Sequence, residues 1–293
     1  MGHNKKAQGL KFFIAFAAPT VFIFITVVLI PFVYGVIMTF TDTNGISSSI
    51  NWIGFKNYIQ VIKDKAFWSS LLITIEYVLA SVIFTNALSF IIAYLLTLGI
   101  KGQSFLRSAF FTPNLLGGIV LGLVWRFIFQ KFFVYIGTAF HIPILEVSWL
   151  ADSHKALIAM IIVSIWKTTG YLMIIYIAGF TSIPKDLLEA ADIDGCNKLQ
   201  KILKIQAPMM ASSFVICTFL TITGSFMAYD INVSLTKGDP FGSTTLISLN
   251  IFREAFVHNN YGKGQAEAII LFIIIAFIAS LQVYLGKKAE VEQ

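Results

Sequence analysis

Long apolar stretches separated by short polar segments recur along the chain. Each stretch is long enough to cross a bilayer core of about 30 Å, which takes roughly 20 helical residues. The pattern therefore predicts six transmembrane helices, at residues 12–40, 68–98, 108–130, 156–181, 209–230 and 266–286. Pro19 and Pro31 lie in the first stretch, so we expect kinks near its ends. The predicted fold class is an all-α membrane protein with a single transmembrane domain, residues 1–293.

The distribution of lysine and arginine predicts the orientation, because positive residues concentrate in short cytoplasmic segments. Eight such residues lie on the longer segments of one side. Eleven lie on short segments of the other side: Lys5, Lys6, Lys11, Lys101, Arg107, Lys185, Lys198, Lys201, Lys204, Lys287 and Lys288. The denser side is expected to face the cytoplasm, which places the N- and C-termini inside and the longer loops outside.

Composition supports a membrane protein and excludes a soluble one of this length. Hydrophobic residues make up 57% of the 293, charged residues 12%, and the mean hydropathy is +0.81. The net charge of +6 is scattered beside apolar runs, so we interpret it as an orientation signal and expect no nucleic-acid partner. The only cysteines, Cys196 and Cys217, suggest neither a disulfide nor a metal site.

The segment between the fourth and fifth predicted spans carries the most informative motif. It reads Glu189-Ala190-Ala191-Asp192-Ile193-Asp194-Gly195, followed by Ile205-Gln206-Ala207-Pro208. Pro184 can begin a helix, Gly195 suits the left-handed position that ends one, and Asn197 can cap the next. Residues 182–208 are therefore predicted to form a cytoplasmic helix-turn-helix, although a bare E-A-A triplet would more often belong to an ordinary amphipathic loop.

This segment resembles the EAA loop of binding-protein-dependent ABC importers, with Ala207 as the single mismatch where the family has Leu. Weaker matches in the same order and spacing extend the resemblance to sugar permeases of the maltose and glycerol-phosphate class: Pro31–Asp42, Gly54–Tyr58, Arg107–Pro113 and Leu235–Pro240. The resemblance implies that this loop receives mechanical work from a separate ATPase subunit. Its implied coupling residues are Glu189, Ala190, Ala191, Asp194, Gly195, Ile205 and Pro208.

The resemblance also implies the partners. They are a second homologous permease subunit, two copies of an ATP-binding subunit, an extracellular solute-binding protein and membrane lipid, in a bacterial cytoplasmic membrane. The chain itself has no G-x-x-x-x-G-K-[ST] phosphate loop and no H-E-x-x-H spacing. We therefore expect a non-catalytic subunit with no catalytic residues, metal or cofactor of its own.

Polar residues inside predicted spans four and five suggest a path for the solute, because such groups are costly in lipid. Hydroxyl groups and aromatic rings suit a sugar, and the resemblance places the transport site in the middle of these spans. The candidate residues are Trp166, Lys167, Thr168, Tyr171, Thr221 and Ser225. Each hydroxyl could instead bond its own helix or a neighbouring helix.

Lys167 is the unusual member of this set. Glu76 in the second predicted span lies at comparable depth, at 1.5 Å of rise per residue. We expect these two residues to form a structural ion pair in preference to a role of Lys167 in contacting solute.

These observations predict a permease subunit of an ATP-driven importer of a carbohydrate, an oligosaccharide in the first instance, that works by alternating access. One alternative is an importer of glycerol-phosphate or another polar solute. A self-sufficient channel, a secondary carrier or a membrane scaffold would leave the EAA spacing without a purpose, and the spans lack the chain of acidic residues that a proton-coupled carrier needs.

Overall fold

The computed structural model describes residues 13–47 and 50–288. Over these residues the chain is helical, with one isolated antiparallel bridge between Thr41 and Trp52 and no strand. The predicted all-α class is therefore confirmed. Lys5, Lys6 and Lys11, which entered the orientation argument, lie outside the described residues. The described helices fall into two compact units, one ending at Asp64 and completed by Ile251–Leu271, the other formed by Lys65–Asn250 and the residues from Phe272.

The first unit begins with helical segments that follow one another without a break. They are η1 (Phe13–Ala17), α2 (Ala18–Phe24), η2 (Ile25–Leu29) and α3 (Ile30–Met38). Pro31 cannot donate a backbone hydrogen bond, and the wider π-helical turn of η2 ends two residues before it. A loop then leads to the short helix α4 (Lys56–Lys63). The unit is completed by η7 (Arg253–Val257) and the start of α16 (Tyr261–Lys287).

Close packing holds the loop after α3 in place within this unit. A methyl group on Gly262 would lie 2.4 Å from the carbonyl oxygen of Thr41, so only glycine allows this approach. The Gly262 amide donates a hydrogen bond of 2.9 Å to the Thr43 carbonyl. The Asn57 amide donates to the carbonyls of Thr39 and Thr41 at 2.8 and 2.9 Å. The loop, α4 and the start of α16 are thereby joined.

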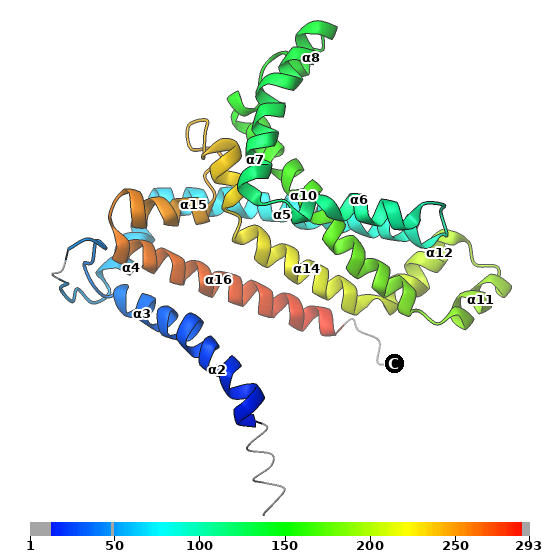
Figure 1. Cartoon of the computed structure of the whole chain (residues 1–293), viewed down its shortest axis with the longest axis horizontal. Helices are drawn as coiled ribbons and strands as arrows, with labels where there is room; N and C mark the ends of the chain where they lie inside the picture. The colour runs from blue at the N-terminus through cyan, green and yellow to red at the C-terminus, as the bar shows by residue number, and fades with distance from the viewer. Residues whose placement is uncertain (1–12, 48–49, 289–293) are drawn as a thin grey trace, which may run out of the picture. The chain divides into compact units, whose positions relative to one another are not determined.

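The second unit is built on α5 (Lys65–Thr97), α10 (Ser153–Ser182) and α14 (Ala211–Phe226), which lie side by side (Figure 1). Their core includes Leu172, Met173, Tyr176 and Cys217. The ring of Tyr176 packs against Phe90 and Phe214, with centroids 5.6 and 5.1 Å away. In a bilayer such close packing, and not escape from water, drives helix association.

A partly buried polar network also connects these three helices. The Tyr176 hydroxyl donates to the side-chain oxygen of Asn86 at 2.8 Å, and the Asn86 amide donates to the Thr221 hydroxyl at 3.3 Å. Each helix contributes one residue, so the network fixes the rotation of α5, α10 and α14 about their axes. The Ser89 hydroxyl adds a bond of 2.9 Å to the Thr169 carbonyl.

The remaining elements of the second unit are shorter and connect or flank the three long helices. They are α6 (Gln103–Leu115), α7 (Gly118–Phe127), η3 (Ile128–Phe132), α8 (Phe133–Phe140), α9 (Pro143–Glu146), η4 (Trp149–Ala151), α11 (Lys185–Ile193), α12 (Lys198–Lys201), η5 (Ile202–Gln206), α13 (Ala207–Met209), η6 (Asn232–Thr236) and α15 (Ile247–Phe252), whose last two residues belong to the first unit.

The third predicted span, 108–130, is wrong in its boundaries. Helix α6 ends at Leu115, and the segment long and apolar enough to cross a membrane is Gly118–Phe140. Pro113 and the pair Gly117-Gly118 explain the break, because proline and glycine weaken a helix. Helix α6 packs along α10, whereas α7 turns away from it (Figure 1).

Among the described residues, five helices are long and apolar enough to span a membrane, or six if a bent pair counts as one span. The bent pair is Lys198–Met209 with Ala211–Phe226, which meet at 74°. Helix α14 has 16 residues and so extends about 24 Å, less than the bilayer core. The predicted fifth span, 209–230, therefore leaves helical geometry before its expected end.

Candidate functional site

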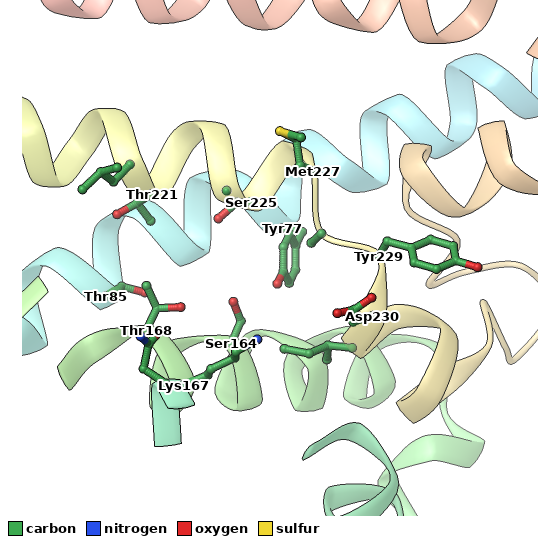
Figure 2. A pocket seen from close by; sticks show the side chains of 15 residues that line it. Tyr77, Thr85, Ser164, Lys167, Thr168, Thr221, Ser225, Met227, Tyr229 and Asp230 are labelled. Atoms are coloured by element: carbon green, nitrogen blue, oxygen red, sulfur yellow. The ribbon is translucent and has the colours of Figure 1, made fainter. Parts of the chain in front are cut away.

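A cavity of about 330 Å³ opens inside the second unit, between α5, α10 and α14. Figure 2 shows polar side chains from these helices around a common space. Tyr77 and Thr85 come from α5, Asn114 from α6, and a run of α10 and α14 residues completes the lining: Ser164, Lys167, Thr168, Leu220, Thr221, Gly224 and Ser225, followed by Met227–Ile231.

Four of the six predicted solute-binding residues line this cavity: Lys167, Thr168, Thr221 and Ser225. The hydroxyls of Thr168 and Ser225 have no hydrogen-bond partner among the described residues. The Thr221 hydroxyl donates to the Cys217 carbonyl at 2.7 Å, so its hydrogen is used within its own helix. Thr221 therefore keeps only acceptor capacity for a solute.

Trp166 and Tyr171 are not among the lining residues. The Trp166 ring meets Trp125 of α7 edge to face, with centroids 5.5 Å apart. Tyr171 is 40% exposed. Trp166 lies two positions before Thr168 and therefore points to nearly the opposite side of α10, because successive residues on a helix differ in direction by about 100°.

Six polar lining residues are not among the predicted ones: Tyr77, Thr85, Asn114, Ser164, Tyr229 and Asp230. Ser164 lies one turn before Thr168 on α10, and this spacing could have identified it. Tyr77 and Asn114 lie in other predicted spans, where no local pattern relates them to α10. Tyr229 and Asp230 lie at the end of the fifth predicted span.

The expected ion pair between Glu76 and Lys167 is wrong. Among the described residues neither side chain forms a hydrogen bond or an ion pair. The neighbouring Tyr77 faces the cavity and is 1% exposed, while Glu76 is exposed on another face of α5. Successive residues on a helix differ in direction by about 100°, so only one of the two can face α10.

The early end of α14 shapes one wall of the cavity. Met227 is a turn residue, Ala228 and Tyr229 have no regular structure, and the chain is helical again from Asp230 into η6. Gly118 at the start of α7 packs against Asp230, where an added methyl group would be 2.6 Å from the Asp230 Cβ. Irregular backbone at membrane depth is tolerated where it lines a cavity. Interrupted helices commonly form transport sites for the same reason.

The motif residues after α10 lie on two short helices. Helix α11 ends at Ile193, and Gly195, two residues further on, has the expected left-handed conformation with a φ of +75°. Asn197 caps α12 through a capping box with Gln200, also as expected. An ion pair between Lys201 and Asp192 connects the two helices. Ile205 lies in η5 and Pro208 in α13.

One side of α11 is anchored and the other is open. Ala191 is 4% exposed, and Leu188 packs against the core of the second unit. Glu189, Ala190 and Asp194 are exposed, and nothing lies within 4 Å of the position that a Gly195 Cβ would occupy. Ile193, Leu199 and Leu203 expose 87, 63 and 61% of their surface. Apolar side chains exposed to this degree suit a surface that a partner covers.

A charged cluster lies in the first unit. The Lys263 ammonium is 2.6 Å from an Asp64 oxygen and 2.9 Å from a Glu254 oxygen. Burial by itself would raise the pKa of Glu254, but hydrogen bonds from His258, Lys263 and Asn260 outweigh it and lower this pKa below its usual value. The cluster joins the segment before α5, η7 and the start of α16.

No group of three or more His, Cys, Asp or Glu residues in the described part could hold a metal ion.

Comparison with known proteins identifies relatives along almost the whole chain. The family model of the binding-protein-dependent transport system inner membrane component matches residues 3–291. The "Probable starch degradation products transport system permease protein AmyD" of Thermoanaerobacterium thermosulfurigenes is 42% identical over 98% of this chain and 99% of its own. The "Multiple sugar-binding transport system permease protein MsmF" of Streptococcus mutans is 33% identical over 89% of this chain and 90% of its own.

A solved structure shares the fold. It is the crystal structure of "a bacterial ABC transporter involved in the import of the acidic polysaccharide alginate", with a TM-score of 0.83 over 97% of both chains. The sequence identity is 19%, so this likeness concerns the arrangement of helices alone.

Proposed function

The chain belongs to the family of binding-protein-dependent transport system inner membrane components, and from this premise we propose that it is the permease subunit of an ATP-driven carbohydrate importer. The observation that carries the proposal is its 42% identity, over 98% of the chain, to a permease named for starch degradation products. The cavity agrees with such a solute, because hydroxyl, amide and charged groups at its wall can bond sugar hydroxyls. An oligosaccharide is the solute class proposed.

The assembly we propose contains this chain, a second homologous permease subunit, two ATPase subunits and an extracellular solute-binding protein. ATP hydrolysis then takes place on the ATPase subunits. Both termini and residues 182–208 face the cytoplasm of a bacterial cell, as the density of positive charge in the short segments indicates.

Residues 182–208 are proposed to transmit movement of the ATPase to the spans. The anchored side of α11 contacts the core that α5, α10 and α14 share, and its open side carries Glu189 and Ala190. A displacement of α11 would therefore reach the helices that surround the cavity. This continuity supports alternating access, in which the cavity opens to one side of the membrane at a time.

Carbohydrate uptake tests the transport function. Deletion of the gene should abolish uptake of one labelled carbohydrate from a panel of neutral and acidic oligosaccharides and glycerol-phosphate, and the plasmid-borne gene should restore it. Uptake of glycerol-phosphate alone would transfer the function to the alternative solute class. Unchanged uptake of every compound would contradict the proposal.

The coupling role is tested with a matched pair of glycine variants. Gly195 and Gly99 have φ values of +75° and +77°, and neither has an atom within 4 Å of an added Cβ. Valine should cost about 1–2 kcal/mol of backbone strain at either position. We expect Gly195→Val to lose both uptake and co-purification of the ATPase, whereas Gly99→Val keeps them. Equal behaviour of the two variants would refute the coupling role.

A further inference from the structure

The cavity holds two opposite charges that the protein leaves uncompensated. Lys167 of α10 and Asp230 after α14 both line it, the first partly exposed and the second exposed, and neither side chain has a hydrogen bond or ion pair among the described residues. Figure 2 shows the Asp230 carboxylate beside the space that Tyr77 and Ser164 also border. An unpaired charge is costly at membrane depth, so such groups mark a position where water or a solute completes the contacts.

Three uncharged polar side chains in the same wall are also without partners. Asn114, Thr168 and Ser225 line the cavity, and none forms a side-chain hydrogen bond to another described residue. Ser225 is buried and Asn114 and Thr168 are partly exposed, so their unpaired polar groups are open to the cavity, where a polar ligand with several hydrogen-bonding groups can bond them. Together the five side chains offer both donors and acceptors.

The chemistry of the two charges restricts that ligand. An ammonium group only donates hydrogen bonds and an ionised carboxylate only accepts them, whereas a sugar hydroxyl does both. A neutral oligosaccharide can therefore satisfy Lys167 and Asp230 at the same time. A carboxylate or phosphate on the sugar would gain at Lys167 but be repelled by Asp230, and like charges facing each other in a binding site strongly disfavour the complex.

We infer that the cavity selects neutral oligosaccharides over uronate-containing or phosphorylated ones, and that Asp230 is the residue that rejects the anions. This inference rests on the proposed carbohydrate function and names the solute class within it. The alginate importer with the same arrangement of helices is named for an acidic polysaccharide. Charge selectivity is thus assigned to the cavity side chains of this chain and not to its fold.

The test is a binding measurement that bypasses the solute-binding protein. The importer is purified with its co-purifying subunits into lipid nanodiscs. Equilibrium dialysis at pH 7 and low salt then compares maltotetraose with its counterpart in which every C6 hydroxymethyl group is oxidised to a carboxylate. The two probes share ring stereochemistry and linkage, so they differ in charge. The variants are Asp230→Asn, nearly isosteric, and Glu76→Gln as a control that removes a carboxylate outside the cavity.

We expect the unmodified importer to bind maltotetraose at least tenfold more tightly than the oxidised probe. Asp230→Asn should strengthen binding of the oxidised probe about tenfold and change maltotetraose binding less than threefold. Glu76→Gln should leave both affinities unchanged. Equal binding of the two probes by the unmodified importer, or an unchanged ratio in Asp230→Asn, would overturn the inference while leaving the carbohydrate function intact. If neither probe binds and the cells import no carbohydrate from the panel, the proposed function fails and the inference fails with it.

Discussion

The contact between α6 and α10 depends on one glycine, and replacing it should measurably destabilise the second unit. A methyl group on Gly170 would lie 1.9 Å from the Phe110 carbonyl oxygen and 2.4 Å from its carbon. Both atoms belong to the backbone of α6, so no side chain can rotate away. Gly170→Ala therefore forces the two helices apart.

The size of the effect follows from this distance. Carbon and oxygen approach to about 3.3 Å in ordinary contacts, so α6 would have to move by about 1.4 Å along most of its contact with α10. Overpacking of this kind costs about 1–3 kcal/mol and sometimes more. Alanine recovers about 1 kcal/mol through its better helix propensity. Because the clash is with backbone that cannot rotate away, the upper end of the overpacking range applies, and we expect a net loss of about 2 kcal/mol, with Asn114 of α6 displaced from the cavity wall.

Thermal unfolding in detergent, followed by fluorescence-detected size-exclusion chromatography, measures this loss. A decrease in midpoint of about 4–8 °C is expected for Gly170→Ala. Gly224→Ala is the matched control, because it adds the same methyl group to α14 with nothing within 4 Å. Its midpoint should stay the same or rise slightly. Equal midpoints for Gly170→Ala and the unmodified chain would show that α6 and α10 do not approach as closely as described.

Two predictions concern the charged cluster of the first unit. Lys263→Met leaves the carboxylates of Asp64 and Glu254 without their cation and should lower the free energy of unfolding by about 2 kcal/mol. The control Lys63→Met changes an exposed lysine and should alter the unfolding midpoint little. Equal midpoints for the two variants would contradict the role of the cluster. Because the pKa of Glu254 is lower in the folded state than its usual 4.5, its contribution to stability is complete above about pH 4.5 and lost as pH falls through the lower folded-state pKa. Unfolding midpoints between pH 7 and pH 3 should therefore depend less on pH in Glu254→Gln, and an unchanged slope would refute this assignment.

Features fixed by neighbouring residues could be predicted from the sequence. The left-handed conformation of Gly195 follows from the backbone freedom of glycine. The capping box follows from the pairing of Asn197 with Gln200, three residues further along the chain. The third span was placed too early because the break at Gly117-Gly118 lies within an apolar stretch. Hydropathy alone does not distinguish a bent segment from a straight one.

The sequence by itself determined the helical class, the apolar runs and the linear motif between the fourth and fifth of them, since each depends on residues close together in the chain. Only the tertiary structure decided which side chains share the cavity. Helices that are apolar on all sides carry little periodic signal for their inner face. The direction of each face therefore depends on contacts with other helices, such as Trp166 with Trp125 or Tyr176 with Asn86. The meeting of Lys167 and Asp230 in one cavity, with Glu76 turned away, depends on such contacts between distant residues, which no local pattern records.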